Sequence, residues 1–160
     1  MISILLFNCH PGANNDSILN QFKGRWYSVK RTIPYSSFLT IDSSYNYEYW
    51  GGACMSRFKS KGRCKVNGDT LILNSDSTKE CYYLCRFGIN CIRVIYDPVH
   101  PNQYTPRPTT QKGCRPISSD EYVVFDQEKF ILKDSLLIHI PNPENPCPEE
   151  KDNFARHPYK

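Results

Sequence analysis

The sequence predicts an all-β fold, in which an antiparallel up-and-down meander closes into a small barrel stapled by disulfide bonds. Aromatic residues make up 13% of the 160 residues, and eleven of them are tyrosines, which favours strands over helices. Apolar residues recur with a period of two, and short polar turns separate the apolar runs. Closure into a barrel removes the unpaired edges that an open meander would expose.

The first expected element is a short helical turn at 16–22, with Asp16 or Ser17 as its cap. The clearest turn is Asn67-Gly68, because both residues accept positive φ and so favour a two-residue hairpin. The last three strands are expected to form a meander of their own. Strands are expected at about 25–33, 36–42, 45–50, 54–66, 70–75, 79–87, 91–97, 120–126, 129–133 and 135–140.

A short apolar run, Ile2 to Phe7, is followed by Asn8 and then by Cys9. This pattern resembles the end of a bacterial lipoprotein signal peptide, whose cysteine is lipidated after cleavage. Residues 1–13 are then the end of a signal and a tether, and the protein is exported and lipid-anchored at Cys9. The alternative is a first strand at 2–7 with Cys9 as a disulfide partner. The run is in either case shorter than the ~20 apolar residues that span a bilayer.

Length and a hydrophobic fraction of 39% fit one core, so we expect a single barrel domain at 14–140. Within it, a proline-rich loop at 98–116 is too long for a passive connection and is either a functional lid or a disordered excursion. An extended proline-rich arm is expected at 141–160, with loose last residues at 153–160.

Eight cysteines exceed what a reduced cytosolic protein of this size normally carries. No paired C-x2-C knuckles are present and the four histidines are isolated, so disulfides are favoured over metal. The connectivity stays open. The disulfide candidates are Cys54, Cys64, Cys81, Cys85, Cys91, Cys114 and Cys147.

Gly24-Arg25-Trp26 is similar to the G-x-W signature of the first lipocalin strand, and residues 45–73 resemble small lipocalin-like lipoproteins of bacteria. The resemblance covers roughly 22–75, with a weaker echo at 121–138. It implies a calycin-type barrel that is closed near Trp26, with Gly24 and Trp26 in structural roles. The interior of such a barrel either holds a small apolar molecule or is filled by side chains. In this family an arginine of the last strand covers the tryptophan, and the expected last strand at 135–140 has no arginine.

Five basic residues alternate with small or apolar residues along the strand expected at 54–66, so they should share one face. One interpretation is a stripe that binds an anion such as a lipid headgroup, a lipopolysaccharide phosphate or an acidic glycan. The other is a solvated outer face that discourages edge pairing. The five residues are Arg57, Lys59, Lys61, Arg63 and Lys65.

Tyr45, Tyr47 and Tyr49 occupy alternate positions, and Trp50 follows them. We take these four residues as the candidate ligand-binding set, because an aromatic face could stack a sugar or an apolar ring. The alternative is a core face whose tyrosine hydroxyls form hydrogen bonds at the rim.

The sequence contains none of the usual hydrolase, metalloprotease or phosphate-loop motifs, so we expect no enzyme, no metal and no cofactor. A net charge of +4 spread over the chain does not indicate nucleic acid. The first hypothesis is an exported, lipid-anchored protein that binds a small apolar or amphipathic ligand at the cell envelope. The alternative is an interaction or structural module without a ligand, which contacts an anionic envelope component through the basic strand face or the proline-rich loop.

Overall fold

The computed structural model describes residues 13–29, 36–53, 56–88, 109–110, 113–116, 118–143 and 153–158. The expected strand at 91–97 and most of the proline-rich loop lie outside these residues. So do four of the cysteines, Cys9, Cys54, Cys91 and Cys147.

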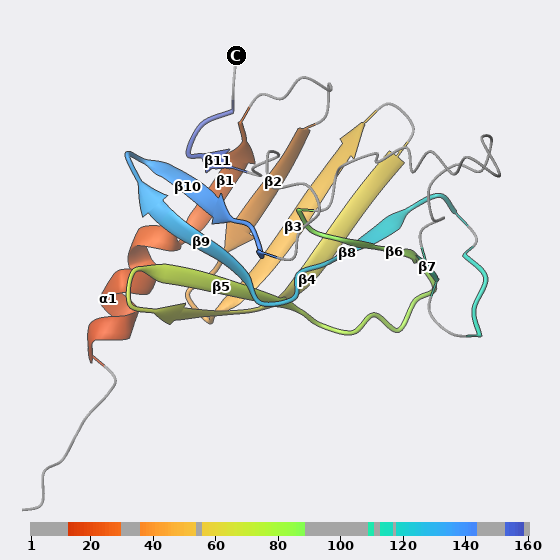
Figure 1. Ribbon diagram of the computed structural model, residues 1–160, viewed down its shortest axis with the longest axis horizontal. Helices are drawn as coiled ribbons and strands as arrows, with labels where there is room; N and C mark the ends of the chain where they lie inside the picture. The colour runs from red at the N-terminus through yellow and green to blue at the C-terminus, as the bar shows by residue number, and fades with distance from the viewer. Residues whose placement is uncertain are drawn as a thin grey trace, which may run out of the picture.

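Eight strands of the described residues form a closed ring in which every neighbouring pair is antiparallel (Figure 1). The predicted all-β barrel is therefore confirmed. Around the ring the strands are β1 (Gly24–Ser28), β2 (Ser36–Ile41), β3 (Asn46–Ala53), β4 (Ser56–Asn67), β5 (Thr70–Ser75), β9 (Glu128–Lys133), β10 (Leu136–Ile140) and β11 (Phe154–Ala155).

Three further strands lie beside the ring: β6 (Tyr83–Arg86), β7 (Thr109–Thr110) and β8 (Glu121–Val124). β8 runs parallel to β4 at Phe58 and Lys59, and β6 runs parallel to β8. The reason is the length of β4, whose second half pairs with β5 while its first half accepts β8. The expected terminal meander of three strands is wrong, because β9 lies between β5 and β10 and does not pair with β8.

The β4–β5 hairpin forms where it was predicted, but its turn residues are Gly68 and Asp69. Asn67 stays in the strand and pairs with Thr70. Gly68 has φ +60°, and glycine at the first central position is typical of a type II′ turn. The hairpin thus relies on the glycine and does not place Asn67 at positive φ.

The helix α1 (Ala13–Phe22) is longer than the single turn expected at 16–22, and it packs Leu19 and Phe22 into the core. No helix in the described part of the chain is long and apolar enough to cross a membrane. The indole Nε1 of Trp26 donates a hydrogen bond to the carbonyl oxygen of Phe22 at 2.6 Å. This bond joins the end of α1 to the first strand of the barrel.

The expectation of an extended arm over the whole of 141–160 is wrong in part. Phe154–Ala155 forms a strand of the ring. Arg156, which was assigned to a loose end, places its guanidinium carbon 3.6 Å from the centre of the Trp26 ring. It also donates hydrogen bonds to the carbonyl oxygens of Gln21 and Lys23. The residue that covers Trp26 is therefore an arginine just beyond β11, outside the expected strand at 135–140. Gly24 has φ +110°, and a Cβ there would lie 2.9 Å from the Arg156 guanidinium.

Candidate functional site

Two members of the candidate ligand-binding set, Tyr47 and Tyr49, lie inside the barrel and are buried. The Tyr47 hydroxyl forms hydrogen bonds with the hydroxyls of Ser60 and Ser75, at 3.3 and 2.9 Å. Burial raises the pKa of Tyr47 above its usual range. Tyr45 is half-buried and packs against the same core. These three tyrosines therefore belong to the core, which is the alternative that the sequence left open.

Phe87 and Phe125 fill the interior beside them. They lie just beyond β6 and β8, and their rings stack with centroids 4.2 Å apart. Phe87 also packs against Tyr49 and Phe154, which belong to the ring strands. Both phenylalanines are at most 4% exposed. β6 and β8 lie beside the ring, but the residues that directly follow them thus place aromatic side chains in its interior.

One polar pair is buried in this aromatic core. His139 Nε2 lies 2.8 Å from a carboxylate oxygen of Glu128, and both side chains are buried. The His139 ring packs against both Phe87 and Phe130. Its other nitrogen, Nδ1, is the only buried side-chain nitrogen or oxygen of the described residues without a hydrogen-bond partner. Such atoms are rare in folded proteins, because an unpaired buried polar group is costly.

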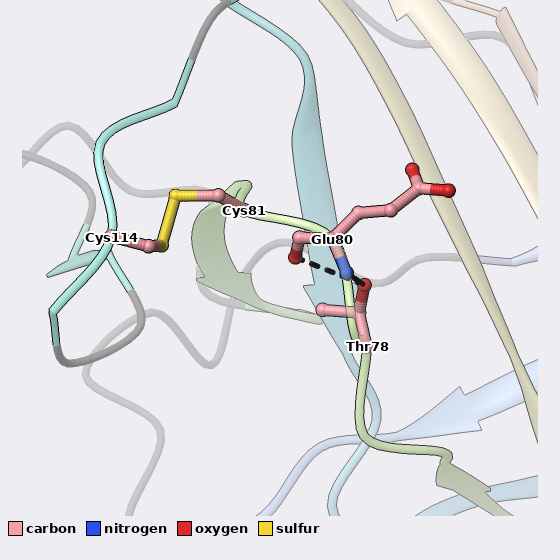
Figure 2. The surroundings of a disulfide bond; sticks show 4 residues. All are labelled: Thr78, Glu80, Cys81 and Cys114. Atoms are coloured by element: carbon pink, nitrogen blue, oxygen red, sulfur yellow. Dashed lines mark hydrogen bonds between the residues drawn. A yellow bond between two sulfur atoms is a disulfide. The ribbon is translucent and has the colours of Figure 1, made fainter.

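Cys81 and Cys114 form a disulfide bond, which confirms that the chain is cross-linked (Figure 2). The bond fastens the segment before β6 to residues 113–116. Next to it, the Glu80 amide donates a hydrogen bond to the Thr78 hydroxyl at 3.2 Å. In Figure 2 the Glu80 carboxylate points away from the disulfide, and it forms an ion pair with Lys59 at 3.8 Å.

Two other disulfide candidates, Cys64 and Cys85, are free thiols, so their assignment as disulfide partners is wrong. Cys64 faces the core from β4, and Cys85 lies on β6 with its thiol 3.9 Å from the carbonyl oxygen of Tyr122. Burial raises the pKa of Cys64 to about 11 and that of Cys85 to about 12. Both thiols are therefore protonated near neutral pH, which makes them poor nucleophiles.

The predicted alternation along β4 is present in the structure. Ser60, Gly62 and Cys64 are buried on the inner side, and the basic residues lie on the outer side. Arg57, Lys61, Arg63 and Lys65 are exposed, whereas Lys59 is half-buried.

The middle of this stripe, at Lys61, is mixed in charge. Lys61 lies in a surface groove between β2, β3 and β4 together with Asp42, Glu48 and Asp76. Glu48 is the direct cross-strand partner of Lys61. Hydrogen bonds from Asn46 hold the pKa of Asp42 below its usual value, so this carboxylate is charged. The stripe is therefore not a continuous cationic surface.

The first residues of the stripe border outward-facing aromatic residues, of which Trp50 is exposed and Tyr27 and Phe38 are half-buried. Register places Tyr27 of β1 beside Phe38 of β2, then Trp50 of β3, then Lys59 of β4. Trp50 is 46% exposed, the most exposed large hydrophobic side chain among the described residues. It lies on the outer side of β3, so its grouping with Tyr47 and Tyr49 in one binding set is wrong.

Two cations contact this aromatic row. The Arg25 guanidinium lies 4.5 Å from the centre of the Phe38 ring. The Lys59 ammonium lies 4.5 Å from the ring centre of Tyr82 and 6.0 Å from that of Trp50. We call this surface the aromatic-basic face. Its residues are Arg25, Tyr27, Phe38, Trp50, Arg57 and Lys59.

Sequence reasoning found Trp50, Arg57 and Lys59 but missed Arg25, Tyr27 and Phe38. Each missed residue is at an outward position of a predicted strand, so alternation alone could have placed it outside. Which of these residues lie side by side depends on the register in which the strands pair, and the sequence did not specify that register.

In comparisons with known proteins, no family model matches the chain, and no curated protein or solved structure matches it significantly.

Proposed function

We propose that this protein is an exported interaction module that binds an anionic partner at the cell envelope through its aromatic-basic face. The observation that carries the proposal is the placement of Arg57 and Lys59 beside exposed Trp50 on one outer face of the barrel. The resemblance to lipocalin-like lipoproteins and attachment through a lipidated Cys9 belong to this proposal. The Cys81–Cys114 disulfide supports an oxidising location.

The packing of the interior supports a surface function over carriage of a ligand. Phe87 and Phe125 occupy the space between the ring strands, and the aromatic side chains around them are buried. A barrel of eight strands is just wide enough to be filled by such side chains. The outer face, in contrast, leaves a large aromatic ring and basic groups in water.

The experiment is a comparison of two variants with the same charge change. The face variant carries Arg57→Glu and Lys59→Gln, and the control variant carries Lys133→Glu and Lys129→Gln on the exposed side of β9. Binding to an isolated cell-envelope fraction and to heparin is measured at rising salt. Since a basic residue near an anionic surface contributes ~1 kcal/mol, the face variant should bind at least roughly tenfold more weakly. Equal loss in the two variants would show that only net charge matters.

A second candidate function is carriage of a small, mainly apolar ligand with one polar group inside the barrel. The unpartnered Nδ1 of buried His139 favours it, since such an atom could hydrogen-bond a guest. The protein is incubated with a total envelope lipid extract and weighed by native mass spectrometry. A discrete added mass that is lost on denaturation and in His139→Leu would support carriage. An unchanged protein mass would contradict it.

A further inference from the structure

We propose that the partner of the aromatic-basic face is the interfacial region of an anionic lipid bilayer. This inference rests on the proposed function and deepens it, because it specifies the chemistry of the partner.

The face combines the two kinds of side chain that favour a bilayer surface. Tryptophan and tyrosine are enriched at the level of the lipid headgroups, because their rings are apolar and carry one polar group. Tyr27 of β1 and Trp50 of β3 lie on the same outer side of the sheet, with Phe38 of β2 between them. The row crosses three strands, so one contact with a bilayer could engage all three rings.

Cations lie at the edges of this row. Arg25 stacks on Phe38 at one edge, and Lys59 lies near Trp50 at the other. Arg57 is exposed two positions before Lys59 on the same side of β4. Glu80 is paired with Lys59, and exposed Glu48 lies two positions before Trp50 on the same side of β3, so the face carries three cations beside two carboxylates. That excess of positive charge complements an anionic surface.

The position of Lys59 argues against a sugar as the main partner. Its ammonium lies near the Trp50 ring and is held by Tyr82 and Glu80. A sugar that stacks on Trp50 would compete with this ammonium for the ring. An ammonium beside an indole instead suits the boundary between acyl chains and phosphate groups, where the ring enters and the charge stays near the phosphate.

The test uses the full chain with Cys9→Ala, so that lipidation cannot supply the membrane contact. Sedimentation with phosphatidylcholine vesicles is compared with sedimentation with vesicles that also contain phosphatidylglycerol. We expect binding to the anionic vesicles alone, and about tenfold weaker binding for Trp50→Ala. The matched control is Ile140→Ala, which removes the other exposed large hydrophobic side chain of the described residues and should leave binding unchanged.

Fluorescence gives an independent readout, because the chain has two tryptophans and Trp26 is fully buried. Insertion of Trp50 should shift its emission to the blue on addition of anionic vesicles, and Trp50→Phe should abolish the shift. Charge-dependent binding to heparin without binding to vesicles would overturn the bilayer inference and leave the proposed function standing. Binding to neither probe nor to envelope fractions would overturn both.

Discussion

Replacing Phe87 with alanine is expected to lower the free energy of unfolding by about 3–5 kcal/mol. The Phe87 ring is buried and contacts aromatic rings from two sources: Phe125 in the segment after β8, and Tyr49 and His139 of the ring strands. Removing it leaves a cavity in the middle of the barrel, and the surrounding strands are too constrained to close it. Urea unfolding followed by circular dichroism measures the loss.

The control for this prediction is Phe38→Ala, which removes the same side chain from a half-buried outer position. It should cost roughly 1 kcal/mol, because less apolar area leaves water there on folding. The Cys81–Cys114 disulfide is kept intact in both variants and checked by mass. Similar losses for Phe87→Ala and Phe38→Ala would mean that Phe87 does not fill the interior, which would revive carriage of a ligand.

The fold was predictable where local pattern decides it. Alternation located the strands at 70–75 and 129–133 to within a residue, and Gly68 marked a hairpin that forms. β4 was harder, because it has three partner strands, and no local pattern states that one strand will pair with β8 in parallel and β5 in antiparallel orientation. Phe154–Ala155 was missed because two residues in a proline-rich segment are too few to show an alternating apolar pattern. They nevertheless complete the ring.

The candidate site was predictable only in part for the same reason. The basic residues of β4 were placed correctly on one face, since alternation requires it. Their surroundings depend on side chains from other strands, such as Glu48 opposite Lys61 and Trp50 opposite Lys59. Cross-strand partners are set by register, and a single sequence with unknown pairing does not fix the register. The free thiols of Cys64 and Cys85 were missed because inward position and oxidation state both depend on tertiary structure.

Replacing Arg156 with alanine is expected to lower the free energy of unfolding by about 2–4 kcal/mol. Its guanidinium covers Trp26 and donates to two carbonyl oxygens at the end of α1, those of Gln21 and Lys23. Hydrogen bonds from a charged group contribute about 1.5–3 kcal/mol, and a cation over an indole adds about 0.5–2 kcal/mol. The variant should also lose protection of the α1 amides in hydrogen exchange, because the carbonyl groups that end the helix lose their partner.

Two variants make this prediction specific. Arg156→Lys should recover little, because an ammonium is a compact charge that cannot both stack on an indole and bond two carbonyls. Arg86→Ala removes an exposed arginine that pairs with Asp126 at 3.4 Å, and such surface pairs contribute ~0–1 kcal/mol. If Arg156→Ala cost no more than Arg86→Ala, the guanidinium would be an ordinary surface group and the end of the barrel near Trp26 would be closed by α1 alone. A large loss that Arg156→Lys does not restore would instead show that a residue outside the expected domain is needed to close it.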